Sequence, residues 1–530
     1  MVTGWGVRML GKAFGALVGL AVIAVAVPGN AHARPISTES AEAACAGTGT
    51  DFNGDGQFDL VVADPQATVD GVSQAGLVRV VYGGGKGTVE LSQALPNDGA
   101  APERGDQFGF SWSVYDADGD TCSDLVVGVP YEDVAVGGVN QLDAGAVYVY
   151  HGSPGGLGTE SAPIDNLTQH ALNAGALTEA HDLFGYSLAS GTAASGEPWL
   201  AIGVPGEALT ADGTVRAEAG AVEYLQGSSV CGITQDSTGV PGVVEAHDRM
   251  GASLTGTNRY FAVGSPGEAI GTEQFAGMVT VLSHTLENGC PKPLIGLDQA
   301  ETGSGLPGVA EAGDQLGASV SMTNYRPASQ SYNTDALLAI GAPGESIGTV
   351  SSAGTVSVVR VQPTGTVDAV ATVDASVPDV EGDPTTGDFL GQRVTLANTD
   401  TSVPTGAGTV RLAVGIPGRD VGDAEDAGVV QVFRPLDSAI GSSDKTLSRA
   451  ASGSLLPGVA TTRDYLGISL RSGSNVLYVG APYSKEPATS KGALYAVPWA
   501  VVDAGSGTAT RYQPGVDGIP DAGVSFGVVG

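Results

Sequence analysis

Two nine-residue segments, Asp51–Asp59 and Asp116–Asp124, carry oxygen-bearing side chains at a spacing that suits a metal ion. Glycine in each segment permits a sharp turn, so that oxygens at positions one, three, five and nine converge and position seven adds a backbone carbonyl. A hard cation such as Ca²⁺ takes about six to eight oxygen ligands of this kind. The expected ligands are Asp51, Asn53, Asp55, Gln57 and Asp59 in the first loop, and Asp116, Asp118, Asp120, Cys122 and Asp124 in the second.

The same two loops have an alternative interpretation as polar turns, in which Asp and Asn side chains cap backbone amides. Convergent carboxylates repel one another when no cation is present, so we expect one calcium ion in each loop. Position twelve is Val62 or Val127 where an EF-hand has glutamate, so these loops are not EF-hands.

The elements that must position these loops belong to a repeat. A short apolar run that ends in a small residue, with proline two positions later, occurs seven times at intervals of 61 to 77 residues. Branched residues closed by a proline, which cannot donate to a ladder, indicate a buried β-strand. The runs are Leu60–Ala63, Leu125–Gly128, Leu200–Gly203, Phe261–Gly264, Leu338–Gly341, Leu412–Gly415 and Leu477–Gly480.

Two further signals accompany these runs. The first is a small residue followed by glycine, which opens a second strand, as at Ala144-Gly145. The second lies before the apolar run and consists of an acidic residue followed, two positions later, by an apolar residue and glycine. Each unit therefore has about four strands and must stack on its neighbours to bury both faces. This predicts an all-β, seven-bladed β-propeller of four-stranded antiparallel blades over residues 45–530. The second of these two signals includes Phe108-Gly109, Phe184-Gly185, Met250-Gly251, Leu316-Gly317, Leu390-Gly391 and Leu466-Gly467.

The first unit lacks the apolar-glycine element, whereas the chain ends in Gly523–Gly530 with a Phe526-Gly527 pair. We therefore expect the C-terminal segment to supply the missing strand of the first blade and to close the ring. Residues 45–50 are the alternative source of that strand.

The Phe-Gly element, the acidic loop and the Gly-x-Pro element together resemble FG-GAP repeats, as found in the propeller of integrin α-subunits. The resemblance covers nearly the whole chain after residue 44. It implies calcium in the acidic loops and recognition of a protein ligand at an extracellular surface. The loops at the same position in units three to seven lack the carboxylate series, so only two calcium sites are expected.

Charge and the N-terminal segment restrict where the protein acts. With 57 acidic and 23 basic residues, a net charge of −34 disfavours nucleic-acid and anionic-membrane partners. Arg8 and Lys12 precede an apolar run, and Ala31-His32-Ala33 fits a cleavage site, so residues 1–33 are interpreted as a signal peptide and 34–44 as a linker. No later apolar stretch is long enough to span a membrane. We expect a secreted protein.

Four cysteines in an exported chain suggest two disulfides, for which three pairings are possible. Cys231 and Cys290 follow the outer strand regions of consecutive units, which places them at one end of adjacent blades. The Cys122 sulfur stays free while its carbonyl faces the metal, so it can reach the segment that contains Cys45. The expected bonds are Cys45–Cys122 and Cys231–Cys290.

No catalytic constellation is evident in the sequence. Gly523–Gly527 matches the G-x-S-x-G nucleophile pattern but lacks the downstream Asp and His, and the six histidines show no metal-ligand pairing. We therefore expect a non-enzymatic binding or adhesion module for a protein or glycan, with recognition in variable loops such as Tyr131–Asp143 and Glu207–Glu218. A hydrolase, because similar propellers accompany a phospholipase, and a sugar-binding lectin are the alternatives.

Overall fold

The computed structural model describes Cys45 and residues 49–95, 101–159, 162–172, 177–300, 306–450 and 454–530. The chain divides into Met1–Glu42 and Ala43–Gly530, and the second unit holds all of the described residues. The expected signal peptide (1–33) and linker (34–44) lie outside them. Within the described part of the chain, no helix is long and apolar enough to cross a membrane.

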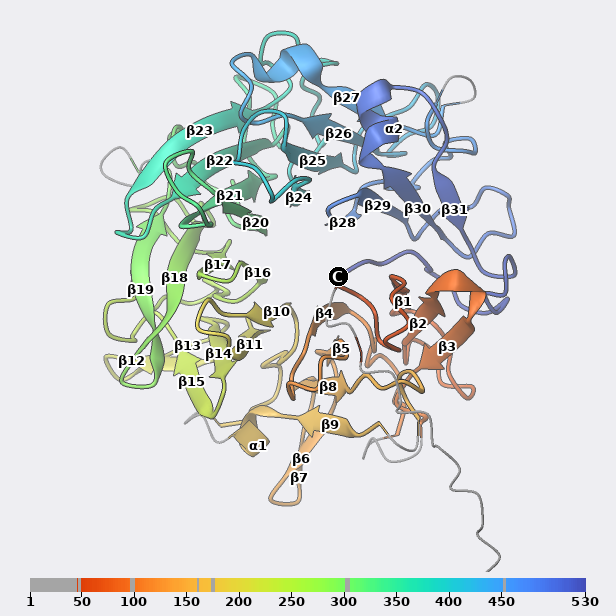
Figure 1. The fold of residues 1–530 in the computed structure, drawn as a ribbon. Helices are drawn as coiled ribbons and strands as arrows, with labels where there is room; N and C mark the ends of the chain where they lie inside the picture. Colours follow the sequence, from red (N-terminus) through yellow and green to blue (C-terminus); the bar gives the residue numbers. More distant parts are fainter. Residues whose placement is uncertain are drawn as a thin grey trace, which may run out of the picture. The chain divides into compact units, whose positions relative to one another are not determined.

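The described residues form seven antiparallel sheets, the blades, arranged around a ring (Figure 1). Blades 2 to 7 each have four strands, which follow one another from the centre of the ring outwards, and the first strands of consecutive blades contact one another. The sequence-based prediction of a seven-bladed propeller with four-stranded blades is confirmed.

The strands of the blades have the following bounds. Blade 1 contains β1 (Leu60–Asp64), β2 (Leu77–Tyr82) and β3 (Gly87–Leu91), and blade 2 contains β4 (Ser111–Tyr115), β5 (Asp124–Val129), β8 (Ala146–Tyr150) and β9 (Ile164–Leu167). Blade 3 contains β10 (Leu188–Thr192), β11 (Pro198–Val204), β14 (Ala221–Gln226) and β15 (Ser229–Ile233), and blade 4 contains β16 (Ser253–Gly256), β17 (Tyr260–Ser265), β18 (Met278–Glu287) and β19 (Cys290–Leu297). Blade 5 contains β20 (Ser319–Tyr325), β21 (Asp335–Ala342), β22 (Thr355–Val361) and β23 (Val367–Val373). Blade 6 contains β24 (Arg393–Asn398), β25 (Val410–Ile416), β26 (Val429–Phe433) and β27 (Lys445–Leu447), and blade 7 contains β28 (Ser469–Ser472), β29 (Val476–Ala481), β30 (Ala493–Pro498) and β31 (Thr510–Tyr512).

The second strand of each blade is apolar because both faces of the blade are covered by neighbouring blades. β5, β21 and β25 are buried along their whole length. The hydrophobic core therefore lies between the blades, and one cluster joins Val281 of blade 4 to Ile340 of blade 5. Continuous apolar runs, without strict alternation, are the sequence pattern expected of strands buried on both faces.

The repeated glycines mark the closest approach between blades. Gly128, which ends the apolar run of blade 2, lies against Gly185 of blade 3, and an added Cβ at Gly128 would sit 2.2 Å from the Gly185 carbonyl oxygen. Gly203 and Gly251 repeat this contact between blades 3 and 4. The Gly-x-Pro element and the apolar-glycine element of the next blade are therefore the two sides of one backbone contact.

The C-terminal segment closes the ring, as expected from the sequence. The amide of Ala63 in β1 donates to the Val528 carbonyl (2.9 Å), and the Val528 amide donates back to Ala63 (3.2 Å). Asp64 accepts hydrogen bonds from the amides of Val524 (2.7 Å) and Ser525 (3.0 Å). The alternative, in which residues 45–50 supply this strand, is wrong: Cys45, Gly49 and Thr50 lie beside the acidic loops instead.

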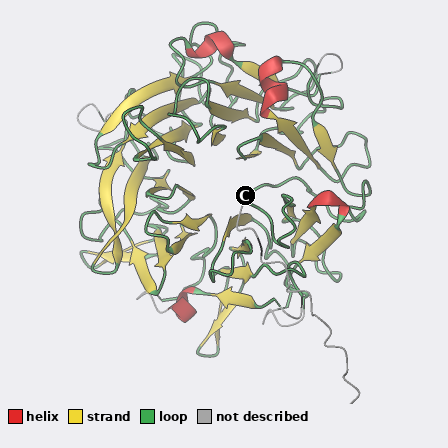
Figure 2. Cartoon of the chain, in the orientation of Figure 1, coloured by secondary structure: helices red, strands yellow, loops and turns green. Residues whose placement is uncertain are grey.

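Two of the expected variable loops form hairpins outside the blades. β6 (Val134–Val136) pairs with β7 (Val139–Gln141), and β12 (Leu209–Ala211) pairs with β13 (Thr214–Arg216). Helical segments are short and lie at the periphery (Figure 2). They are α1 (Gln169–Leu172), α2 (Trp499–Ala504), η1 (Gly83–Gly85) and η2 (Ile440–Ser443).

Candidate metal centre

The two acidic loops occupy equivalent places in neighbouring blades and contact each other. Loop 1 (51–59) leads into β1, and loop 2 (116–124) connects β4 to β5. The Ser153 amide, which follows β8 in blade 2, donates to the Phe52 carbonyl of loop 1 (3.1 Å). The Cys45–Cys122 disulfide ties the segment before loop 1 to loop 2. Both loops therefore present their side chains from one shared edge of blades 1 and 2.

Both expected disulfides are present in the structure. Cys45 is bonded to Cys122, and Cys231 is bonded to Cys290. Cys231 lies in β15 and Cys290 begins β19, so the second bond joins the outer strands of blades 3 and 4. The Cys122 sulfur is engaged in the disulfide, which leaves its carbonyl as the only ligand atom that this residue can offer.

In loop 1 the expected ligands fold the loop around themselves. Asp51 accepts hydrogen bonds from the amides of Asp55 (3.2 Å) and Gly56 (2.9 Å), and the Asn53 side-chain oxygen also accepts from Asp55 (3.1 Å). Asp55 in turn accepts from the Gln57 amide (2.8 Å). These contacts hold the side chains of positions one, three and five on the inside of one tight turn.

Loop 2 has the same pattern with a denser cluster of charge. Asp116 accepts from the Thr121 amide (3.1 Å), Asp118 from the Asp120 amide (3.1 Å), and Asp120 from the Cys122 amide (2.7 Å). Carboxylate oxygens of Asp116, Asp118 and Asp120 all lie within 4.8 Å of one another. Such a cluster of like charges favours a bound cation.

The aspartates at position nine anchor each loop to its blade. Asp59 accepts from the amides of Phe52 (3.0 Å) and Gly83 (2.8 Å), and Asp124 accepts from those of Ala117 (2.7 Å) and Gly152 (2.7 Å). Both carboxylates are buried. Burial raises the pKa of Asp59 above its usual value, and the charges of neighbouring Asp51 and Asp55 raise this pKa further.

The loops differ in how tightly the structure gathers their ligands. Among the described residues, three carboxylates with oxygens within 4.8 Å of one another occur in loop 2, and loop 1 has no such group of three. Loop 1 borders a cavity of about 230 Å³, which is lined by Asn53, Asp55, Tyr82 and Lys86 among others. Loop 2 therefore concentrates more negative charge than loop 1, in which position three is the uncharged Asn53.

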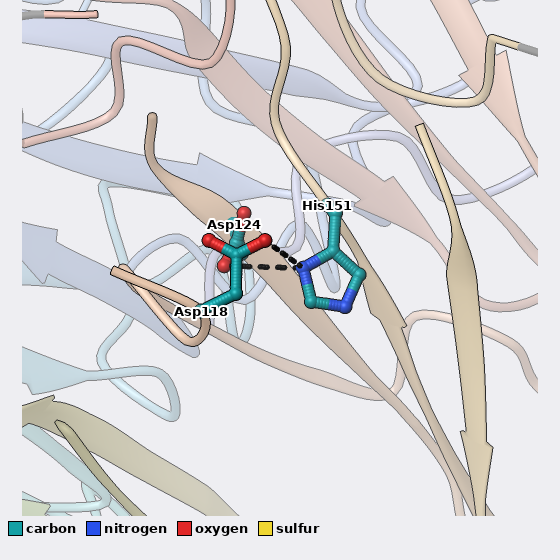
Figure 3. Close-up of side chains that lie close together, drawn as sticks. All are labelled: Asp118, Asp124 and His151. Atoms are coloured by element: carbon teal, nitrogen blue, oxygen red, sulfur yellow. Dashed lines mark ion pairs between the residues drawn. The ribbon is translucent and has the colours of Figure 1, made fainter. Parts of the chain in front are cut away.

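Beside loop 2, directly after β8, lies His151, which the sequence did not reveal as part of the site (Figure 3). Nδ1 of His151 lies 3.5 Å from oxygens of both Asp118 and Asp124, and Nε2 lies 3.0 Å from Asp165. Hydrogen bonds to Asp124 and then Asp165 raise the pKa of His151 to about 9, although burial opposes this shift. The expectation that no histidine pairs with metal-ligand residues is thus wrong for His151.

Strand register shows which residue of blade 1 occupies the position that His151 occupies in blade 2. Leu60 of β1 pairs with Val81, and Leu125 of β5 pairs with Tyr150, so His151 occupies the place of Tyr82 in blade 1. His151 directly precedes Gly152, whose amide donates a hydrogen bond to Asp124. Its proximity to loop 2 could be predicted from the sequence only if the pairing of β5 with β8 were known.

Comparisons with known proteins agree with the repeat assignment. A model of the FG-GAP repeat matches residues 108–150, which run from the Phe-Gly element through loop 2 to the end of β8. Phosphatidylinositol-glycan-specific phospholipase D from Mus musculus is 35% identical over 111 residues, and the enzyme of that name from Rattus norvegicus is 36% identical over 110 residues. These matches cover 21% and 20% of this chain but only 13% of each relative.

Solved structures match this chain with low similarity. Sqt1 of Saccharomyces cerevisiae matches with a TM-score of 0.36 and 11% identity, over 74% of this chain and 72% of that one. A putative 6-phosphogluconolactonase from Bacteroides uniformis matches with a TM-score of 0.41 and 11% identity, over 88% of this chain and 98% of that one. Residues 108–150 are thus similar to an FG-GAP repeat, and the described residues form a seven-bladed β-propeller.

Proposed function

We propose that this protein is a secreted, calcium-binding propeller that recognises an extracellular protein or glycan and does not itself catalyse a reaction. The observation that carries the calcium assignment is the pair of equivalent acidic loops. In each, three side chains fold inwards on a turn and a buried aspartate anchors the loop. Oxygen-rich loops of this kind match the ligand preference of Ca²⁺.

Calcium in these loops would have a structural role. The loops join blades 1 and 2, where the ring is closed by the C-terminal segment rather than by continuous chain. A cation that neutralises the clustered carboxylates would therefore stabilise the part of the ring that depends on non-local contacts. Extracellular calcium modules bind with dissociation constants of about 0.1–1 mM.

Recognition is assigned to the face that carries the variable loops. A cleft of about 530 Å³ is lined by Tyr131 and Asp143, at the ends of the β6–β7 loop, and by Glu218, at the end of the β12–β13 loop. Phe110 packs edge-on against Tyr131 (5.8 Å between ring centres) and in a tilted arrangement against Tyr186 (4.9 Å). A concave surface with aromatic and charged groups on rigid blades supports binding of a partner molecule.

The calcium assignment is tested by metal titration of single-residue variants. Wild-type protein is expected to bind two calcium ions, Asp55→Ala and Asp120→Ala one each, and the double variant none. Asp236→Ala, which changes an exposed acidic residue in blade 3, serves as the control and is expected to bind two. At about 2 mM free calcium and a dissociation constant of about 0.1 mM, each site adds roughly 1.8 kcal/mol to the unfolding free energy. Zero stoichiometry in the wild type would leave the polar-turn interpretation in place.

The partial match to a phospholipase gives the second candidate function, an extracellular hydrolase. It is tested by an activity screen of the pure protein against phosphodiester, ester and glycoside substrates. Turnover that survives repurification and is lost in a single-residue variant would establish the hydrolase and overturn the binding-module proposal.

A further inference from the structure

Polar side chains are buried at the junctions between blades, and three junctions contain an arginine. Arg419 forms two hydrogen bonds with Asp388 (2.9 and 2.6 Å) between blades 5 and 6, and Arg449 pairs with Asp464 between blades 6 and 7. Burial raises the pKa of Asp64, where the ring closes, and the positive charge of nearby Arg79 opposes that shift. The interior of a junction thus has the shape and polarity to hold a guanidinium group.

The three arginines occupy three different positions of the repeat. At the junction between blades 2 and 3, each of these positions holds a glutamate or a glutamine instead of an arginine. Glu223 corresponds to Arg79, because Ile202 pairs with Glu223 as Val62 pairs with Arg79. The remaining two correspondences follow from sequence position. Glu207 follows Pro205-Gly206 as Arg419 follows Pro417-Gly418, and Gln169 stands two residues after the last residue of β9 as Arg449 does after β27.

The junction between blades 2 and 3 therefore buries carboxyl groups where other junctions place a cation. Asp182, Glu207 and Glu223 are 1%, 6% and 0% exposed. Gln169 donates its amide hydrogen bond to Glu207 (2.8 Å), and neither carboxylate oxygen of Glu223 accepts one. Burial raises the pKa of Asp182 to about 8 and that of Glu223 to about 7, although the Glu179 amide, which donates to Asp182, and the Gln169 side chain near Glu223 oppose these shifts.

Two of these residues, Glu207 and Glu223, border a cavity of about 540 Å³ that is also lined by residues of the β12–β13 hairpin. Glu179, Glu207 and Glu223 line it together with the apolar side chains of Leu177, Leu209 and Val215. No basic side chain is among the described residues that line it. A lining of acidic groups and apolar side chains is complementary to a guanidinium head on an aliphatic stem.

We propose that this cavity binds a guanidinium group, supplied by a small guanidine or by an arginine side chain of a partner. The inference is independent of calcium binding, since none of its residues belongs to the acidic loops. It rests on the unpartnered, fully buried Glu223, on the cavity that Glu223 lines, and on the arginines that fill equivalent positions elsewhere in the same ring.

The test is calorimetric titration of the full chain with agmatine at pH 8, compared with cadaverine, which has an ammonium group in place of the guanidinium. Wild type is expected to bind agmatine and to bind cadaverine at least about tenfold more weakly, because only the guanidinium forms paired hydrogen bonds with carboxylates. A peptide arm with acetyl-Gly-Arg-Gly-amide and its lysine counterpart distinguishes the sources. Binding of agmatine alone identifies a small guanidine, and binding of the arginine peptide as well identifies a side chain of a partner.

Variants locate the site. Glu223→Gln is expected to weaken agmatine binding about tenfold or more, and Glu207→Arg, which copies the Arg419 arrangement, to abolish it by filling the cavity. Glu268→Gln is the matched control, because Glu268 is a buried glutamate that accepts from Gln235 at the next junction and does not line the cavity. It is expected to leave agmatine binding unchanged.

Three results would overturn the proposal: no agmatine binding by the wild type, equal binding of cadaverine, or unchanged agmatine binding by a folded Glu223→Gln variant. Thermal unfolding of each variant confirms the fold. Calcium stoichiometry, measured on the same Glu223→Gln sample, is expected to match the wild type. Failure of guanidinium binding is thereby distinguished from failure of the calcium assignment.

Discussion

At the scale of single residues, the most demanding positions are the glycines at which one blade meets the next. Gly220, which opens the third strand of blade 3, has a positive φ of 83°, and an added Cβ would lie 2.3 Å from the backbone nitrogen and oxygen of Met250. Gly213, at the tip of the β12–β13 hairpin, has a similar φ of 74° but no atom within 4 Å of an added Cβ. Alanine at Gly213 would therefore cause backbone strain alone, whereas alanine at Gly220 would cause the same strain and a steric clash with Met250.

Replacing either glycine by alanine tests this difference. Gly213→Ala is expected to cost about 1–2 kcal/mol, the strain of a left-handed alanine. Gly220→Ala is expected to cost about 1–3 kcal/mol more, because the two blades must move apart. Urea unfolding of both variants measures the difference, and equal costs would contradict the close backbone contact as the reason for the repeated glycine.

A second residue-scale contrast separates the two acidic loops. Tyr82 beside loop 1 uses its hydroxyl to accept the Leu157 amide (2.8 Å), whereas His151 at the equivalent place beside loop 2 faces Asp118 and Asp124. A histidine contributes positive charge or a nitrogen ligand to the second loop, and a tyrosine does neither. The two loops therefore share one sequence pattern but have different electrostatic surroundings.

At the scale of structural elements, the blades are joined by buried polar junctions as well as by apolar packing. Between blades 1 and 2, Gln93 donates to Glu132 (2.6 Å), and the equivalent contacts further along the ring are Gln169–Glu207, Gln235–Glu268 and Gln299–Glu345. Burial, together with the charges of Asp106, Glu103 and Asp133, raises the pKa of Glu132 to about 8, while the Gln93 hydrogen bond opposes the shift.

This shift makes a prediction about pH. Because the folded-state pKa of Glu132 is higher than the unfolded one, its contribution to stability is fully present below about pH 4.5 and is lost as the pH rises towards about 8. Glu132→Gln carries no ionisable group there, so its unfolding free energy should rise relative to wild type between about pH 5 and about pH 9. Urea unfolding at several pH values measures this difference.

The control for this experiment is Glu197→Gln, an exposed glutamate of blade 3. Its carboxylate is solvated in the folded and unfolded states, so the difference from wild type should stay constant over the same pH range. A Glu132→Gln variant that follows the control would show that the junction carboxyl group does not titrate on unfolding.

At the scale of the whole molecule, ring closure joins segments from opposite ends of the described chain. Phe526 is fully buried in the hydrophobic cluster that also contains Val62 and Phe108, and the neighbouring backbone pairs with Ala63. Neither disulfide includes the C-terminal segment, because Cys231–Cys290 joins blades 3 and 4 and Cys45–Cys122 joins the segment before loop 1 to loop 2. Closure at blade 1 therefore depends on the non-covalent contacts of residues 523–530.

Removal of residues 523–530 is therefore expected to destabilise the propeller strongly. Loss of a buried phenylalanine alone costs about 3–5 kcal/mol, and the lost strand contacts add to this. Unfolding of the truncated chain is measured with and without a synthetic peptide of residues 523–530, which should restore stability in a concentration-dependent way. A peptide with Phe526→Ala is the control. An unfolding midpoint unchanged by truncation would contradict closure by this segment.

The sequence by itself determined the features that arise from local chain preferences. Proline and small residues ended each apolar run, so the strands, their number and the seven-fold repeat were readable without coordinates. Spacing of aspartates around glycine was enough to locate both acidic loops. The Cys231–Cys290 pairing followed from the repeat, which places both residues at one end of adjacent blades, and the Cys45–Cys122 pairing from the position of Cys122 in the second acidic loop.

Only the tertiary structure decided which polar groups face one another across the blades. Gln169, Glu207 and Glu223 lie on three separate segments, and His151 reaches Asp118 and Asp124 from beyond a neighbouring strand. The local pattern at each of these positions tolerates many residue types, since a strand end or turn forms equally well with glutamate, glutamine or arginine. Their charges acquire meaning only when packing of one blade on the next removes them from water and fixes their partners.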